Sequence, residues 1–198
     1  MDSSSTARFK DQNKILRHFK ERITVCCPKC EGRGEVVTDF TTYNSRFHCL
    51  NCFHQMEKSL VFFDLVLKVY CNQCSHKIVV ETSEVKQKKE SIRVRCSECG
   101  GVESYKPTYI AHTGYSYAFD GVDPFFQLPL WYQASFKDEL FWAYGPEHLL
   151  YLEQYIGARL RERNQRLYAT MVERLPQFIK SAKNRDSLLK LLERMKLK

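Results

Sequence analysis

The stretch Cys27-Pro28-Lys29-Cys30 opens a series of four Cys-x-x-Cys motifs, and these motifs decide the fold of this chain. A two-residue gap lets both thiolates of a tight turn face one tetrahedral ion at about 2.3 Å, and a second motif from a distant hairpin completes the shell. The sequence therefore predicts two zinc sites that share eight of the nine cysteines. Their ligands are Cys27, Cys30, Cys49 and Cys52 in the first site, and Cys71, Cys74, Cys96 and Cys99 in the second.

A zinc ion held by four protein sulfurs has no open position for water or substrate, which a catalytic zinc requires. We therefore expect both ions to be structural. The alternatives are disulfides and redox dithiols. Disulfides suit small secreted chains, but residues 1–6 are polar, and no stretch approaches the roughly 18 apolar residues of a membrane span. A redox dithiol would need one such motif near a βαβ pattern. The expected compartment is the cytoplasm, without membrane contact.

Three further side chains compete for the metal positions. Cys26 precedes Cys27, and we assign Cys27 because it has the motif spacing to Cys30. His48 and His54 flank the second motif, and such histidines are more often surface residues. Whether Cys26, His48 or His54 replaces an assigned ligand stays open at this point, as does the presence of iron in place of zinc, which tetrahedral sulfur sites permit.

The formal charge of +8 is unevenly distributed. Residues 25–145 hold 13 Lys and Arg against 14 Asp and Glu, whereas residues 146–198 hold 12 against 6. Each zinc with four thiolates adds two negative charges, so the metal-bearing region is acidic and poorly suited to neutralising phosphates. The basic run at residues 86–95 is the exception. We interpret it as a solvated hairpin tip in preference to a binding face.

The chain predicts an α+β fold in four segments. Residues 1–24 form a polar tail and a short basic helix over Ala7–Arg22, on which Leu16, Phe19 and Ile23 have helical spacing. Residues 25–104 form two tandem β-rich zinc ribbons, residues 105–145 an aromatic-rich connecting segment, and residues 146–198 a helical part. The strands expected in the ribbons contain Glu35–Phe40, Phe47–Cys49, Phe63–Val69, Ile78–Glu81 and Ile92–Arg95.

In the connecting segment, Tyr115, Tyr117 and Phe119 alternate as on a strand that turns at Asp120-Gly121. Most aromatic residues there are expected in the core, and a protein-binding surface is the alternative. In the helical part, Gly145-Pro146 starts a helix, Leu175-Pro176 interrupts the pattern, and Asn184 is expected to cap a last helix. One helix face carries Leu149, Leu152, Ile156 and Leu160.

Basic residues are concentrated in the helical part, where they form either solvated faces or a docking surface for an acidic protein or nucleic acid. They are Arg159, Arg161, Arg163, Arg166, Lys180, Lys183 and Arg185. The sequence contains few signals for catalysis. The chain contains no GxSxG, HExxH or phosphate-binding glycine loop, and His112 and His148 are isolated. We therefore expect a protein that is not an enzyme.

Two resemblances bear on function. The element Cys27-Pro-Lys-Cys30-Glu-Gly32-Arg-Gly34 resembles the CxxCxGxG element of Hsp40-type chaperones, but the other three motifs lack both glycines and no J-domain signature precedes them. Over nearly the whole chain, the sequence resembles bacterial transcription-factor-IIB-type zinc-ribbon proteins, which are similar to immunity partners of Rhs and related polymorphic toxins. The resemblance is carried by the ribbons and by residues Phe119–Trp131, Phe141–Leu149, Tyr155–Arg163 and Leu175–Arg185.

Relatives of this kind carry a further cysteine-containing turn before the Trp-Ala-Tyr run, whereas Ala134–Leu140 has no cysteine here, so no third metal site is expected. The resemblance implies a cytoplasmic immunity protein that binds a cognate toxin domain and covers its active site, with zinc as a structural element. The alternative is a nucleic-acid-binding regulator that uses the basic C-terminal helices. A zinc-dependent chaperone with many clients is the third class.

Overall fold

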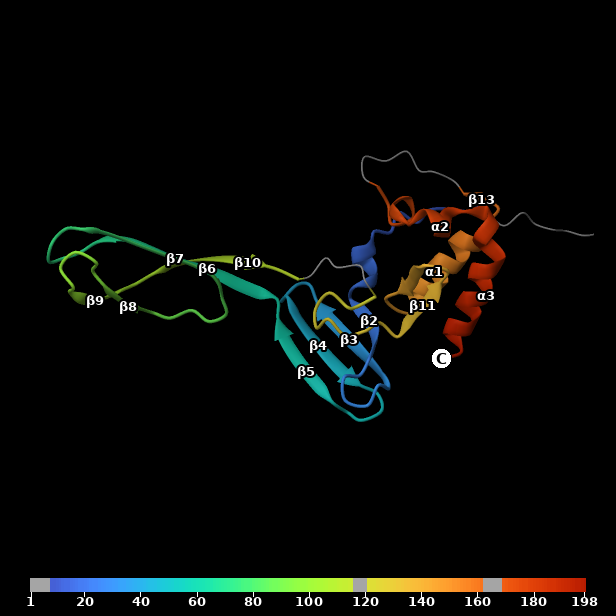
Figure 1. Ribbon diagram of the computed structural model, residues 1–198, viewed down its shortest axis with the longest axis horizontal. Coiled ribbons are helices and arrows are strands. Elements are labelled where there is room, and N and C mark those ends of the chain that lie inside the picture. Colours follow the sequence, from blue (N-terminus) through green and yellow to red (C-terminus); the bar gives the residue numbers. More distant parts are fainter. Residues whose placement is uncertain (1–7, 116–120, 162–168) are drawn as a thin grey trace, which may run out of the picture. The chain divides into compact units, whose positions relative to one another are not determined.

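The structure is a computed structural model that describes residues 8–115, 121–161 and 169–198 (Figure 1). Helices and strands are mixed, and the α+β class predicted from the sequence is confirmed. The chain divides into two compact units. Unit 1 comprises Met1–Lys58 and Tyr117–Lys198, and unit 2 comprises Ser59–Ser116. The first cysteine group therefore shares a unit with the helices, and the second lies in the other unit. Within the three described ranges, no helix has the length and apolarity that a bilayer crossing requires.

Unit 1 contains a four-stranded sheet in the order β2-β3-β4-β5. Val36 and Phe47 lie opposite each other on neighbouring strands, and both are buried on the core side. Burial alternates along β3 and β4, as expected for strands with one face on the core. The strands are β2 (Arg22–Cys26), β3 (Arg33–Asp39), β4 (Asn44–Cys49) and β5 (Gln55–Ser59).

Residues 129–131 and Tyr144 cover the outer edge of β2. The Thr24 N–H donates to the Tyr144 carbonyl at 2.7 Å, and the Trp131 N–H donates to the Thr24 carbonyl at 3.0 Å. A turn centred on Asp123 places this segment. The Asp123 carboxylate accepts three backbone N–H groups, from Phe125, Phe126 and Leu128 at 2.6–2.9 Å. The edge of β2 is thereby closed to further strand pairing.

The remaining core of unit 1 consists of a hairpin and two helices. Strands β11 (Tyr132–Phe136) and β12 (Glu139–Ala143) pair antiparallel. Helix α1 (Pro146–Gly157) begins with proline at its first position, as predicted, and α3 (Arg185–Lys196) contacts it. A short helix, α2 (Gln177–Lys180), follows Pro176. Fully or nearly fully buried side chains in these elements include Phe136, Phe141, Leu149, Leu152, Ile156, Leu188 and Leu192.

The helix predicted over Ala7–Arg22 is wrong. Described residues in this range form β1 (Arg8–Phe9) and a short 3-10 helix over Leu16–Phe19, and β2 begins at Arg22. Asn13 has a φ of 60°, a left-handed conformation that an α-helix does not accommodate. The apolar residues with helical spacing are used separately, because Phe19 stacks on His148 and Ile23 is buried in β2.

Two details of the helical part also differ from expectation. Leu160 was expected on the face of the first helix, but α1 ends at Gly157 and Leu160 belongs to β13 (Leu160–Arg161), which pairs in parallel with β1. Asn184 precedes α3 without a side-chain capping bond. Its amide instead donates to the Phe178 carbonyl at 2.9 Å and accepts from Lys137 at 3.1 Å. The strand expected at Tyr115, Tyr117 and Phe119 lies mostly outside the described residues.

Unit 2 contains two small sheets. One has the order β10-β6-β7, and the other is the hairpin β8-β9. In the region of the second cysteine group, buried Cys71, Ile78 and Cys96 form the core, against which Val69, Val80, Val94 and Tyr105 pack. The strands predicted around Phe63–Val69, Ile78–Glu81 and Ile92–Arg95 are present. The bounds are β6 (Val61–Tyr70), β7 (Lys77–Val85), β8 (Ile92–Arg95), β9 (Val102–Tyr105) and β10 (Thr108–Thr113).

Candidate metal centres

The four Cys-x-x-Cys turns share one backbone geometry. Each begins at or directly after the last residue of a strand, and in each the N–H of the first cysteine donates to a carbonyl oxygen five residues later at 2.8 Å. The donor and acceptor residues are Cys27 and Gly32, Cys49 and His54, Cys71 and His76, and Cys96 and Gly101. Since the same hydrogen bond closes every turn, the two cysteine sulfurs of each turn occupy the same position relative to the strand before it.

A left-handed residue follows the second cysteine in all four turns. The φ values are 57° at Glu31, 57° at Phe53, 58° at Ser75 and 73° at Gly100. Glycine adopts this conformation without a steric cost, whereas other residues pay for contact between Cβ and the following carbonyl. Only the fourth turn has glycine at this position, so the other three accept backbone strain to keep the turn.

The turns bring the eight cysteines into two groups of four. All four sulfurs of each group lie within 4.8 Å of one another. Measured edges are 3.7 Å between Cys27 and Cys52 and 3.5 Å between Cys30 and Cys49. In unit 2 the edges are 3.7 Å between Cys71 and Cys99 and 3.6 Å between Cys74 and Cys96. A tetrahedron with metal–sulfur bonds of about 2.3 Å has edges of about 3.8 Å, so both groups fit a metal ion.

Backbone and side-chain donors are directed at the sulfurs of the first group. The N–H groups of Asn51 and Cys52 both donate to the Cys49 sulfur at 3.3 Å. The Asn51 amide donates to the Cys30 sulfur at 3.6 Å, and the Lys29 N–H donates to the Cys27 sulfur at 3.4 Å. Such donors stabilise thiolates and orient metal ligands.

Within each group, the pKa of some thiols is lowered and the pKa of others is raised. The backbone N–H of Cys52 lowers the pKa of Cys49 to about 6, and the backbone N–H of Cys99 lowers that of Cys96 to about 6. The His76 N–H lowers the pKa of Cys74, but desolvation and the neighbouring sulfurs outweigh it and raise the value to about 12. Four adjacent thiolates repel one another, and a bound divalent cation would supply the positive charge that offsets this repulsion.

This chemistry is that of a structural metal site. Tetrahedral sulfur ligation is preferred by zinc and is also accepted by iron. If Cys27, Cys30, Cys49 and Cys52 bind one ion and Cys71, Cys74, Cys96 and Cys99 bind another, neither ion has a coordination position left for a substrate. Bound metal would cross-link the turns that follow β2 and β4 in unit 1, and those that follow β6 and β8 in unit 2.

The competing ligands lie outside both groups. The Cys26 sulfur approaches the Leu130 carbonyl at 4.0 Å, and burial raises the pKa of this thiol. The His54 ring packs edge-on against Phe47 at 5.9 Å, and its carbonyl oxygen closes the second turn. His48 lies on β4 opposite Glu35. Motif spacing therefore distinguished the grouped cysteines from their neighbours.

The isolated histidines have structural surroundings. His148 is buried, its ring stacks on Phe19 at 4.5 Å, and its Nδ1 accepts the Tyr144 N–H at 3.2 Å. Burial lowers the pKa of His148 to about 3, so this histidine is neutral in the folded protein. In unit 2, the His112 Nδ1 lies 3.7 Å from the Asp64 carboxylate.

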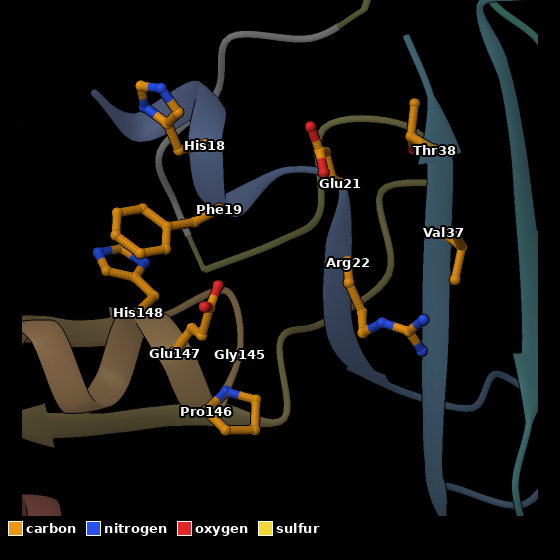
Figure 2. A pocket seen from close by; sticks show the side chains of 10 residues that line it. All are labelled: His18, Phe19, Glu21, Arg22, Val37, Thr38, Gly145, Pro146, Glu147 and His148. Atoms are coloured by element: carbon orange, nitrogen blue, oxygen red, sulfur yellow. The ribbon is translucent and has the colours of Figure 1, made fainter. Parts of the chain in front are cut away.

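A hollow of about 480 Å³ opens beside His148 in unit 1 (Figure 2). Its lining comes from the 3-10 helix, from β2 and β3, and from the first turn of α1. Exposed Glu21 and Glu147 lie on its walls, and the Arg22 guanidinium there pairs with Glu35 at 2.5 Å. Among the described residues, the two cysteine groups are the places where metal-binding side chains converge.

Several basic residues of the helical part support the fold. Arg185 donates to the carbonyls of Ile156 and Ala158 at 3.0 and 3.1 Å, at the C-terminal end of α1. Arg161 donates to the carbonyls of Tyr155 and Lys180 at 3.1 and 2.7 Å. These bonds satisfy carbonyls that a helix end leaves unpaired. Lys180 donates to the Glu173 carbonyl at 2.6 Å. Arg163 and Arg166 lie outside the described residues.

Comparison of the chain with models of protein families, with curated proteins and with solved structures finds no match. The assignment of the metal centres therefore rests on their geometry. The sequence did not single out Asn51 or the left-handed residues. Gly100, at the corresponding position of the fourth turn, is the one signal that could have marked the left-handed positions.

Proposed function

We propose that the protein is a cytoplasmic, non-enzymatic immunity protein. It binds the toxin domain of a secreted polymorphic system of the Rhs type and covers the active site of that domain. Zinc in the two cysteine groups serves as a structural element and takes no part in chemistry. The resemblance of the chain to zinc-ribbon immunity partners suggests this role, and the exposed surface of the first ribbon supports a protein-binding function.

Phe53 is the observation that carries the proposal. It occupies the left-handed position of the second turn and is 79% exposed. Neither backbone preference nor packing explains a phenylalanine at this place, because glycine fits the conformation and the ring gains little burial. Leu50 of the same turn is 47% exposed. A residue that neither suits its backbone conformation nor gains burial is typical of a binding site.

The chemistry of this turn fits a protein partner. A large exposed aromatic side chain beside a leucine is suited to an apolar pocket, and buried aromatic residues dominate the energetics of protein interfaces. The corresponding positions of the fourth turn are Ser97 and Gly100, so the zinc fold does not itself require apolar residues there. We name Leu50 and Phe53 the apolar turn, and we propose that it anchors the toxin domain.

The alternative function, a regulator that binds nucleic acid through the C-terminal helices, receives less support. Arg161, Lys180 and Arg185 each donate to backbone carbonyls within unit 1, so their positive charges are engaged in the fold. Arg159 and Lys183 are the exposed basic residues that remain of the set in the described part of the chain. Phosphate binding usually requires a larger cluster of unpaired cations.

The test is co-expression with the toxin domain encoded beside this gene. We expect the wild-type protein to co-purify with that domain and to restore growth. Phe53→Gly should weaken the complex at least tenfold in calorimetry, because truncating an aromatic hot spot costs about 2 kcal/mol or more. Ser75→Gly places glycine at the left-handed position of the first turn of unit 2, and it should leave the affinity unchanged.

Failure would take one of two forms. If the neighbouring gene encodes no toxin, or if the toxin domain neither binds nor loses activity, the immunity role is wrong. If the complex forms and Phe53→Gly binds as tightly as the wild type, the immunity role stands and the apolar turn is not its anchor. Circular dichroism and zinc content of both variants should match those of the wild type.

A further inference from the structure

The β8–β9 hairpin of unit 2 has two chemically different faces. Burial alternates along both strands, and the register places Ile92 opposite Tyr105 and Val94 opposite Glu103. Val94 and Tyr105 pack against the core formed by Cys71, Ile78 and Cys96. The opposite face is exposed and carries Arg93, Arg95, Val102 and Ser104. We call these four residues the outer face.

The hairpin separates its charges by face. On the two strands of the hairpin, the carboxylate belongs to Glu103, on the inner side, where it accepts from the Asn72 amide at 2.6 Å and from the Tyr105 hydroxyl at 2.9 Å, and the turn adds Glu98, which lies 3.9 Å from His76. The outer face contains two guanidinium groups and no carboxylate. Within the described ranges, neither Arg93 nor Arg95 has a carboxylate within ion-pair distance. Their charges are therefore available to an anionic partner.

The loop before β8 adds further positive charge. Lys86, Lys88 and Lys89 are exposed, and the loop has one carboxylate, Glu90. The sequence suggested a solvated hairpin tip here, but β7 and β8 do not pair with each other and the loop is held in place. The Tyr109 hydroxyl contacts both the N–H and the carbonyl of Lys89, at 2.8 and 3.1 Å, and the Lys88 ammonium lies 4.3 Å from the centre of the Phe63 ring.

We propose that the outer face and residues Lys86–Lys89 bind the phosphate backbone of a nucleic acid. This inference does not rest on the proposed immunity function. Residues two apart on a strand lie on the same face and are separated by about 6.7 Å, so Arg93 and Arg95 stand side by side on the outer face. Guanidinium groups bind phosphate through two parallel hydrogen bonds, and a two-stranded ribbon fits the major groove of a duplex.

Metal bound at the second cysteine group would fix this surface. Cys96 directly follows β8, and Cys99 stands three residues before β9. Zinc would therefore hold the turn of the hairpin against the turn that follows β6. A rigid ribbon loses little conformational freedom on binding, which favours association with a regular polyanion. The surface is suited to phosphate contacts that carry no sequence information.

Fluorescence anisotropy with the full-length zinc-loaded protein tests the proposal. The probes are labelled duplex DNA, single-stranded DNA and single-stranded RNA of one length and mixed sequence. We expect at least one probe to bind at about 50 mM salt and to lose at least about tenfold in affinity at about 200 mM. The form that binds most tightly identifies the natural class of ligand.

Matched variants assign the binding to the hairpin. Arg93→Gln with Arg95→Gln should lower the slope of log affinity against log salt by about 1.8 on duplex DNA, or about 1.4 on a single strand. Lys86→Gln with Lys89→Gln is a second variant, which changes the loop and leaves the hairpin intact. Arg159→Gln with Lys190→Gln removes two exposed charges from unit 1 and should leave the slope unchanged.

Three results would overturn the proposal. The first is that no probe binds at the lower salt concentration. The second is that the unit 1 control loses as much affinity as the hairpin variant, which would indicate attraction by net charge alone. The third is that both unit 2 variants, with wild-type zinc content, bind nucleic acid as the wild type does. If those variants instead lose the toxin domain, the outer face belongs to a protein interface.

Discussion

The left-handed residue after each second cysteine determines whether its turn is strained. At Gly100, with a φ of 73°, an added Cβ would meet no atom within 4 Å, so only the backbone conformation resists substitution. We expect Gly100→Ala to lower the free energy of unfolding by about 1 kcal/mol. Urea denaturation of the zinc-loaded protein measures this change when hydrogen exchange of the amides in unit 2 is used as the readout.

Gly114 provides the matched control for this prediction. It lies in the same unit, its φ is not in the left-handed region, and an added Cβ would meet Phe62 at an ordinary 3.6 Å. Gly114→Ala should therefore cost clearly less than Gly100→Ala. Equal effects of the two substitutions would show that the left-handed conformation does not limit the turn.

We expect His148 to make unit 1 sensitive to acid. Its pKa is about 3 in the folded protein and about 6.5 in the unfolded chain, so the unfolded state binds the proton more readily between these values. We therefore expect the contribution of His148 to stability to be complete above pH 6.5 and to fall toward pH 3, by up to about 1.4 kcal/mol per pH unit. Fluorescence of Trp142, whose ring lies 5.9 Å from His148, reports the transition.

His148→Gln isolates this contribution, since glutamine keeps an acceptor for the Tyr144 N–H and does not titrate. The variant should be less stable at neutral pH and should lose stability more slowly as the pH falls from 6.5. Protonation of the cysteines also destabilises the protein in acid, and this part of the profile should remain in the variant. If the two pH profiles are parallel, burial of His148 does not govern the acid response.

Among single residues, the grouping of the eight cysteines was the most predictable feature. The spacing of Cys27 and Cys30, repeated three times, fixes a local turn, and a local turn is encoded by adjacent residues. The roles of Arg161 and Arg185 were not predictable in the same way. Each donates to carbonyls at the end of a helix that is packed by tertiary contacts, and a sequence does not show which helix end a distant arginine reaches.

At the scale of secondary-structure elements, Arg185 links two helices. It is the first residue of α3, and it donates to two carbonyls at the end of α1. We expect Arg185→Ala to lower the free energy of unfolding by about 2 kcal/mol, because charged hydrogen bonds to otherwise unpaired carbonyls are lost. Thermal or urea denaturation monitored by helical circular dichroism measures this loss.

Two further substitutions sharpen the test. Arg185→Lys keeps the charge but not the planar pair of donors, so it should recover only part of the stability. Arg159→Ala removes an exposed arginine that lies two residues after the end of α1, and it should be nearly neutral. If Arg159→Ala costs as much as Arg185→Ala, the positive charge of the region matters and the capping bonds do not.

Elements with strong periodicity were predictable, and elements created by tertiary contacts were not. Short β-type segments identified β3 and β4, alternation identified β6, and the Gly145-Pro146 pair located the start of α1. The helical spacing of Leu16, Phe19 and Ile23 led to a wrong prediction. These residues belong to a 3-10 helix and to β2, so their spacing does not come from one helix. Strand β5, with mostly exposed residues, offered no pattern to detect.

At the scale of the whole molecule, the two units depend differently on metal. Unit 1 buries a large apolar core that includes Phe125, Phe141 and Ile156. The buried apolar residues of unit 2 are few, and two of them, Cys71 and Cys96, belong to the candidate metal centre. Small domains with such limited cores usually need a metal to fold. We expect a chelator to unfold unit 2 first.

Hydrogen exchange during a chelator titration measures this order of unfolding. Protection of β6, β7 and β8 should disappear while α1 and α3 remain protected. Cys71→Ser should have the same effect without a chelator, because it opens the second group alone. Simultaneous loss of protection in α1 and β6 would show that the two units unfold together and that unit 2 has no separate metal dependence.

Native mass spectrometry of the purified protein is the most direct measurement of the metal centres. The geometry of the two sulfur groups leads us to expect two zinc ions in each wild-type chain, and one in Cys71→Ser. Fewer than one bound ion per wild-type chain would contradict the assignment of both groups as structural metal sites. An unchanged ion count in Cys71→Ser would contradict the assignment of the second group.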